Sequence, residues 1–88
     1  MIIIRPILYT DNQAIAAVIR SVLIEHNVPK VGTAYADVSL DSMFETYNIL
    51  GSSYFVVENN GKIIGGAGVS QLANEAETIC ELQKMYFL

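Results

Sequence analysis

The spacing of the hydrophobic residues changes once along the chain, and this change limits the fold more than any other feature of the sequence. Between residues 10 and 51 the apolar residues recur every three or four positions, whereas from residue 53 onward the spacing becomes alternating. The first pattern is typical of amphipathic helices, and the second is typical of strands. The sequence therefore predicts helices followed by antiparallel strands.

A short β-branched segment precedes the first helix. Residues 2–8 favour a strand, and Pro6, which has no N–H to donate, places this strand at a sheet edge or ends it. Thr10 and Gln13 have the spacing of a capping box, and Asp11 suits the positive end of a helix dipole. The helix that begins here carries one apolar stripe, formed by Ile15, Val18, Ile19, Val22 and Leu23.

A loop and a second helix follow. Pro29 and Gly32 predict a loop over residues 27–37, because both residues interrupt regular structure. Ser39 suits the N-cap of the second helix, and Gly51 suits its C-terminal stop. The apolar face of this helix carries Leu40, Met43, Phe44, Tyr47 and Leu50.

The second half of the chain predicts three strands. Residues 53–58 and 62–69 form a hairpin in which Gly61 supplies a positive φ, and residues 72–77 form a polar connection to a last strand at 78–88. The two faces of that strand are Thr78, Cys80, Leu82, Lys84, Tyr86 and Ile79, Glu81, Gln83, Met85, Phe87. Because both faces mix polar and apolar residues, we expect the strand to lie inside a sheet, covered on both sides. The order β-α-α-β-β-β predicts an α+β fold with two helices over a mostly antiparallel sheet.

The composition is unusually apolar for a single small domain. Of the 88 residues, 52% are hydrophobic and 16% are charged, although a domain of this size buries only about 60–65% of the surface of its unfolded chain. We therefore expect a partner surface or a further part of the protein to cover the excess. The net charge of −4, with five dispersed Lys and Arg residues, argues against nucleic acid as a partner. One cysteine and the lack of a long apolar run indicate a cytoplasmic protein without a membrane partner.

Three features that could carry chemistry have simpler structural explanations. Gly65, Gly66 and Gly68 fit no phosphate-loop spacing and predict instead a bulge or a close backbone approach. His26 has no second ligand residue near it, so we expect no metal site and a position near a helix C-terminus. Cys80 is expected to be a small hydrophobic core residue rather than a nucleophile that uses His26 as its base.

Glu81 is the strongest candidate for a chemical role. It lies inside an apolar strand, where a carboxylate must be hydrogen-bonded, paired, or raised in pKa by desolvation. A pKa raised towards neutrality is what a general base needs. Two alternatives stay open: the acid points into a solvated cleft, or it pairs with Lys84 of another molecule.

The segments IIIRPI, TDNQAI, SLDSMFETY, YFVVENNGKIIGGAGV and CELQKMYFL follow one another along the chain. In this order they resemble the N-terminal half of the GNAT superfamily, the acetyl-CoA-dependent amine N-acetyltransferases. The last segment is similar to the fourth strand of that family, which faces the cofactor. The resemblance covers essentially the whole chain.

The resemblance implies transfer of the acetyl group of acetyl-CoA to a primary amine of a small molecule or peptide, by direct attack of the amine on the thioester. Main-chain groups near the end of the fourth strand then hold the pantetheine arm and polarise the thioester carbonyl. The matching positions here are Met85, Tyr86 and Phe87. An acid on the same strand removes the ammonium proton, and the matching residue is Glu81, with Cys80 and Gln83 as neighbours in an uncertain register.

The family continues beyond this strand with a glycine-containing loop and a helix that hold the CoA pyrophosphate. We therefore expect residues 1–88 to be the acceptor-side half of an acetyltransferase domain, inactive alone. The alternative is a non-catalytic module that forms a homodimer through its last strand. The acceptor is not predicted, although Lys30, Thr33 and Tyr35 of the first loop are candidates for contact with it.

Overall fold

The structure, a computed structural model, describes residues 1–27, 38–71 and 80–88. All but the first residue of the loop expected at 27–37, the whole connection expected at 72–77, and residues 78 and 79 of the predicted last strand lie outside the described residues. The elements follow the predicted β-α-α-β-β-β order. They are β1 (Ile2–Pro6), α1 (Asn12–Glu25), α2 (Met43–Tyr47), β2 (Ser52–Asn59), β3 (Lys62–Gln71) and β4 (Cys80–Phe87), with short 3-10 helices at Tyr9–Asp11 and Val38–Ser42.

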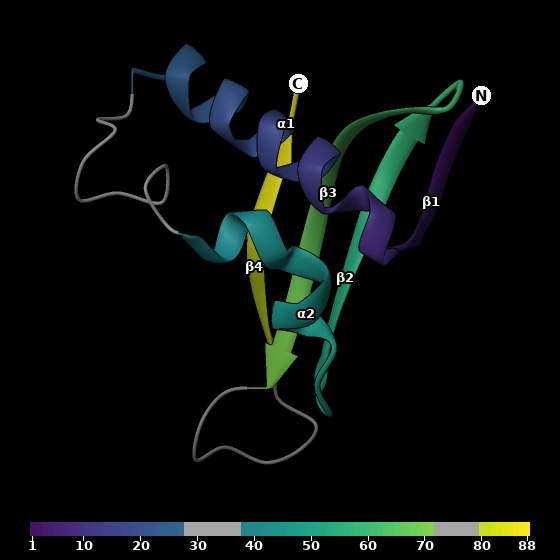
Figure 1. Cartoon of the computed structure of the whole chain (residues 1–88), viewed down its shortest axis with the longest axis vertical. Coiled ribbons are helices and arrows are strands. Elements are labelled where there is room, and N and C mark those ends of the chain that lie inside the picture. The colour runs from purple at the N-terminus through teal and green to yellow at the C-terminus, as the bar shows by residue number, and fades with distance from the viewer. Residues whose placement is uncertain (28–37, 72–79) are drawn as a thin grey trace.

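The four strands form one antiparallel sheet in the order β1-β2-β3-β4, as Figure 1 shows. The predicted hairpin is β2 and β3, and its turn contains Asn60 and Gly61, whose φ angles are 53° and 86°. Two consecutive left-handed residues suit a tight hairpin, because their twist matches that of the strands. β1 lies at one edge, as Pro6 predicted, since proline has no N–H for a second neighbour.

β4 lies at the opposite edge of the sheet and pairs with β3 alone among the described strands. The expectation that this strand lies inside a sheet and is covered on both sides is therefore wrong for the part of the chain that the structure describes. Its mixed pattern has another cause, because most of its side chains are exposed or half-buried. A partly solvated edge strand accepts polar and apolar residues on the same face.

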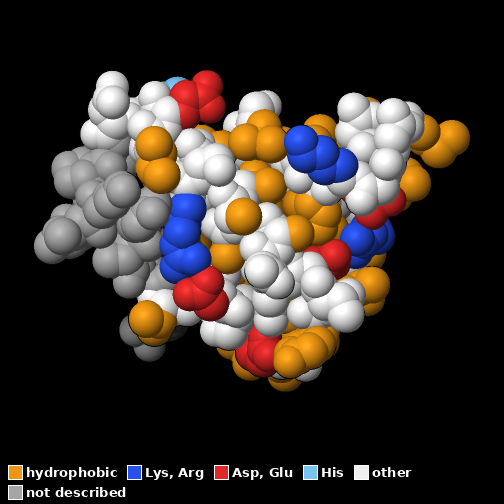
Figure 2. All heavy atoms as spheres, turned by 45° about the horizontal axis from the view of Figure 1, so that its top comes forward, with side chains coloured by type: hydrophobic (Ala, Val, Ile, Leu, Met, Phe, Trp, Pro, Cys, Tyr) orange, Lys and Arg blue, Asp and Glu red, His pale blue; other side chains and the backbone are white. Residues whose placement is uncertain are grey.

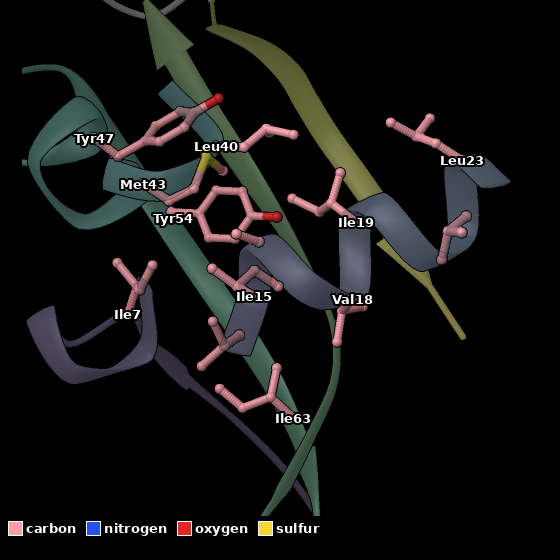
Figure 3. Close-up of a cluster of buried hydrophobic side chains, with 13 residues drawn as sticks. Ile7, Ile15, Val18, Ile19, Leu23, Leu40, Met43, Tyr47, Tyr54 and Ile63 are labelled. Carbon is pink, nitrogen blue, oxygen red and sulfur yellow. The ribbon is translucent and has the colours of Figure 1, made fainter. Parts of the chain in front are cut away.

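Both helices lie over the same face of the sheet (Figure 1). The apolar stripe predicted for α1 is confirmed, because all five of its residues are buried. Figure 3 shows this stripe beside Leu40, Met43 and Tyr47 of the second helical segment and Tyr54 of β2. The core therefore lies between the two helices and the sheet.

The second helix is shorter than predicted and begins later. Its α-helical part has only 5 residues. Asn12, the first residue of α1, explains this start, because its Oδ1 accepts the Phe44 N–H at 2.7 Å and its Nδ2 donates to Glu45 Oε1 at 2.7 Å. A side chain from another helix thus satisfies an unpaired N–H of α2, which a capping rule applied to Ser39 cannot detect.

Four of the five residues predicted for the apolar face of this helix pack into or against the core: Leu40, Met43, Phe44 and Tyr47. The fifth prediction, Leu50, is wrong, because this side chain is exposed. The helix ends at Tyr47, and the chain then turns at Gly51, whose φ is 84°.

Asp11 makes a different contact from the one predicted. The predicted capping box of Thr10 and Gln13 is wrong, because the N-cap of α1 is Asp11, which makes no side-chain hydrogen bond to the helix. Asp11 Oδ2 instead accepts the N–H of Leu8, three residues earlier, at 2.7 Å. Arg5 of β1 donates to both oxygens of Asp11, at 2.7 and 3.0 Å, and to Glu58 Oε2 at 3.0 Å. These hydrogen bonds from Arg5 hold the pKa of Asp11 below its usual value, and they fasten the start of α1 to β1 and β2.

Candidate functional site on strand β4

Strand β4 contains a bulge between Gln83 and Tyr86. Gly68 of β3 lies opposite Gln83, and Gly66 lies opposite Tyr86, so that one residue of β3 faces two residues of β4. Lys84 lies in the bulge and has a φ of 47°, a left-handed conformation that is uncommon outside glycine. An inserted residue bends a strand and changes the face on which the following side chains lie.

The bulge reverses the side-chain alternation that the sequence predicted. Glu81 and Gln83 lie on the helix-covered face, where Gln83 contacts Tyr47 of α2. Tyr86 lies three residues after Gln83, yet it also packs against the core on this face, whereas Phe87 lies on the other face. The predicted common face is therefore wrong beyond Gln83, because a two-residue period does not allow for an inserted residue.

The glycines of β3 leave room for two tyrosine rings. A Cβ on Gly68 would lie 2.7 Å from Tyr54 Cδ2 and 2.9 Å from Tyr47 Cε1, and a Cβ on Gly66 would lie 2.7 Å from Tyr54 Cε1. The two rings themselves are 5.1 Å apart between centroids. The sequence predicted a bulge or a close backbone approach at these glycines, and the structure shows an irregularity between Gly66 and Gly68 together with a close approach of the two rings. Its effect is that both tyrosine hydroxyls reach across β3 to groups of β4.

Tyr54 contacts the bulge directly. Its hydroxyl donates to the main-chain oxygen of Lys84 at 2.8 Å, and the residue is 2% exposed. Burial, and to a smaller extent the neighbouring Tyr47, raise the pKa of Tyr54 well above its usual value. The hydroxyl therefore stays protonated near neutral pH and remains a donor to this carbonyl.

Glu81 is exposed rather than enclosed among apolar neighbours, which corrects the prediction made for it. Gln83 Nε2 donates to Glu81 Oε1 at 2.9 Å, and the Tyr47 hydroxyl donates to Gln83 Oε1 at 2.8 Å. The sequence required this carboxylate to be hydrogen-bonded, paired with a cation or raised in pKa by desolvation, and the structure shows a hydrogen bond. Burial, followed by the charge of Glu81, raises the pKa of Tyr47.

The other candidates from the sequence lie elsewhere. Cys80 is exposed at the start of β4, so its prediction as a core residue is wrong. His26 caps the C-terminus of α1, as predicted. No group of three or more His, Cys, Asp or Glu residues with the arrangement of a metal site occurs within the described ranges. The acceptor candidates Lys30, Thr33 and Tyr35 lie outside the described residues.

Sequence reasoning missed the roles of Tyr47 and Tyr54, which it treated as a core residue and a strand residue. One signal was present, because Gly66 and Gly68 stand in the same strand two positions apart. Paired small residues on one face of a strand indicate a close neighbour. They do not reveal that the neighbour is a pair of rings, of which Tyr47 leads through Gln83 to Glu81 and Tyr54 binds the Lys84 carbonyl.

The hollow beside the Arg5–Asp11 pair does not coincide with this site. It has a volume of about 550 Å³, and its lining includes Lys62 and Leu88 but none of the candidate site residues. On the face drawn in Figure 2, the Lys and Arg side chains stand apart from one another instead of gathering in a patch. Across the described residues, no helix is long and apolar enough to cross a membrane. Within the part of the chain that the structure describes, the candidate site is thus a strand edge and not an enclosed pocket.

Two helices on one face of a four-stranded antiparallel sheet, in this element order, are also found in solved acetyltransferase structures. A GNAT-family acetyltransferase from Staphylococcus aureus Mu50 superposes with a TM-score of 0.78 at 20% identity, covering 99% of this chain and 52% of that one. A predicted acetyltransferase from Clostridium acetobutylicum, solved with acetyl-CoA, superposes with a TM-score of 0.72 at 18% identity, covering 100% of this chain and 60% of that one. The predicted fold class is therefore confirmed.

The sequence comparison agrees with the fold. The chain is 42% identical over 87 residues to the uncharacterized N-acetyltransferase YjgM of Escherichia coli K12. The matched region covers 98% of this chain and 52% of that protein. The chain thus spans about half the length of the curated relative that it matches. No family model matches the chain. By sequence the chain is similar to about half of an N-acetyltransferase, and by fold it is similar to about half of a GNAT-family acetyltransferase.

Proposed function

We propose that residues 1–88 supply the acceptor-side half of an enzyme that transfers the acetyl group of acetyl-CoA to a primary amine of a small molecule or peptide. The observation that carries the proposal is β4, a bulged strand whose outer edge pairs with no other described strand and which carries a hydrogen-bonded carboxylate at Glu81. The proposal is supported by the 42% identity to an N-acetyltransferase.

We assign the binding of the pantetheine arm of acetyl-CoA to the main chain of Met85, Tyr86 and Phe87. The Leu88 N–H donates to Ile64 O at 2.9 Å, so the alternation of an antiparallel ladder directs the N–H and C=O of Phe87 away from β3 and those of Tyr86 towards it. Of the three residues, the geometry therefore supports Phe87 for this contact. Edge groups of this kind pair with an extended, amide-bearing partner. The thioester of bound acetyl-CoA is the group that the amine attacks.

We assign the general base to Glu81. Its exposure leaves it accessible to a solvated ammonium group, and the net charge of −4 favours the approach of a cation. The carboxylate takes the ammonium proton, which releases the nitrogen lone pair for attack on the thioester. Positioned proton transfer of this kind contributes roughly 10²–10⁴ to a rate.

The test is acetyl transfer by a hybrid in which this chain replaces the matched half of YjgM. Release of the CoA thiol is measured with a thiol reagent in the presence of a panel of primary amines. We expect amine-dependent release, and we expect Glu81→Gln to lower kcat at neutral pH about 100-fold or more. Glu45→Gln, a change of the same charge on α2, is the matched control and should leave kcat unchanged. A folded hybrid that binds acetyl-CoA but acetylates no amine would refute the proposal.

The 88-residue chain alone should bind acetyl-CoA weakly. The glycines of β3 form no phosphate cradle, because the space above Gly65, Gly66 and Gly68 is filled by the side chains of Phe87 and Tyr54 and their neighbours. Calorimetric titration of this chain with acetyl-CoA checks the expectation. A dissociation constant in the micromolar range would contradict it.

A second candidate function is homodimerisation through β4, which we also propose for the 88-residue chain. Leu82, Met85 and Phe87 are 59%, 56% and 46% exposed on this edge strand, and an apolar strand edge favours pairing with another copy. Sedimentation should then show a dimer, and Met85→Lys should shift it to a monomer, since a charge on the edge disfavours strand pairing. A wild-type monomer at millimolar concentration would exclude this role.

A further inference from the structure

The hydrogen bonds around Gln83 can have only one direction. A carboxylate is an acceptor only, so the atom of Gln83 that lies 2.9 Å from Glu81 Oε1 must be the donor Nε2. The other end of the amide, Oε1, then faces the Tyr47 hydroxyl at 2.8 Å, and the hydroxyl must be the donor. The ionised carboxylate therefore sets the direction of the whole chain of hydrogen bonds.

One end of this chain is anchored in the core. Tyr47 is 5% exposed, and its ring lies against Tyr54 and over Gly68, where a Cβ would lie 2.9 Å from two of its atoms. Core packing therefore holds the hydroxyl of Tyr47 in place, whereas Glu81 is an exposed side chain on an edge strand. Gln83 connects the two.

We propose that Gln83 is a positioning residue for the general base. It occupies Oε1 of Glu81 and leaves Oε2 as the oxygen that accepts the proton of the acceptor ammonium. Among the described residues, Glu81 accepts its hydrogen bond at Oε1. This inference rests on the assignment of Glu81 as the base under the proposed function.

The proton transfer balances at this atom. The N–H bond of the ammonium breaks, an O–H bond forms at Oε2, and the electron pair of the broken bond stays on nitrogen for attack on the thioester. The cation and the carboxylate become a neutral amine and a neutral acid. Because the proton arrives at Oε2, the bond from Gln83 Nε2 to Oε1 survives the step, and the carboxyl group does not rotate.

The first experiment uses the hybrid protein and the substitution Gln83→Met, which keeps the length of the side chain and removes both hydrogen bonds. We expect kcat to fall about 10- to 100-fold, while KM for acetyl-CoA stays unchanged and the urea midpoint of unfolding falls no further than in Tyr47→Phe. In a Glu81→Gln background, Gln83→Met should have no further effect, because the two residues act as one unit. An equal loss in both backgrounds would overturn the proposal.

The second experiment uses the 88-residue chain without acetyl-CoA, so it still tests the network if the hybrid transfers no acetyl group. Among the described residues, the ionisable groups that interact with Tyr47 are Glu81 and Tyr54. With ¹³Cζ-labelled tyrosine, the resonance of Tyr47 is assigned through Tyr47→Phe and followed against pH. Glu81→Gln should lower the pKa of Tyr47, because removal of the nearby negative charge favours the tyrosinate. Glu45→Gln should leave it unchanged. An identical pKa of Tyr47 in wild type and Glu81→Gln would refute the network.

Discussion

The substitution Tyr54→Phe removes one oxygen atom, and we expect it to weaken the bulge of β4 while leaving the packing of the ring intact. The hydroxyl donates to the Lys84 carbonyl at 2.8 Å from a residue that is 2% exposed. A neutral hydrogen bond contributes about 0.5–1.5 kcal/mol, and a buried acceptor left without a donor costs about 1–3 kcal/mol. Lys84 is half-buried, so water replaces part of the lost bond. We therefore expect the free energy of unfolding to fall by about 1–2 kcal/mol.

The matched control is Tyr47→Phe, which removes the same atom from the neighbouring ring. Its partner is the half-buried side chain of Gln83, which can turn to water, so we expect a loss of only about 0.5 kcal/mol. Urea unfolding followed by circular dichroism measures both values, and equal m values keep the comparison valid. A loss of 1–2 kcal/mol corresponds to a drop in Tm of roughly 5–10 °C for a domain of this size. Equal losses in the two variants would show that the Tyr54 hydroxyl does not hold the bulge.

Two further changes test the packing and the charge cluster. Gly68→Ala places a Cβ 2.7 Å from a ring atom of Tyr54. It should lower the free energy of unfolding, measured in urea, by about 1–3 kcal/mol. In Gly61→Ala the new Cβ meets no atom within 4 Å, but the residue has a φ of 86°, so we expect backbone strain to lower the free energy of unfolding by about 1–2 kcal/mol. Full stability of Gly68→Ala would contradict the packing argument, and full stability of Gly61→Ala would contradict the strain argument. Asp11→Asn removes a carboxylate whose pKa Arg5 lowers, and it should cost about 2–3 kcal/mol at pH 7. The contribution of a carboxylate with a lowered pKa is complete above its unfolded pKa and is lost as the pH falls through its folded value. The stability of Asp11→Asn should therefore depend less on pH below about 4 than that of the wild type, and parallel curves would refute the pairing.

The elements that the sequence predicts correctly are those with local causes. The stripe of α1 repeats at helical spacing, so its burial is a property of the segment itself. The hairpin depends on Asn60 and Gly61, which adopt a positive φ with little cost. The element order follows from these periodicities, and the resemblance to acetyltransferases follows from that order. Local patterns therefore sufficed for the architecture.

The elements that the sequence predicts wrongly have causes that lie far away along the chain. The start of α2 depends on Asn12, which lies 32 residues before Phe44. Asp11 is recruited by Arg5 of β1 and not by the helix that it precedes. In both cases a polar side chain meets a partner that only the folded chain brings near, so rules based on neighbouring residues assign it to the wrong contact.

The bulge of β4 shows how such a distant cause also determines the candidate site. Gly66 and Gly68 admit the rings of Tyr54 and Tyr47, and the hydroxyl of Tyr54 then meets the carbonyl of Lys84. That contact requires the carbonyl to point towards the helices, which a regular strand would not provide, because its carbonyls lie in the plane of the sheet. The same rearrangement ends the alternation after Gln83. The core packing of β3 therefore fixes which main-chain groups at the end of β4 face outward, and a change at either glycine should alter the proposed cofactor edge before it alters the remainder of the fold.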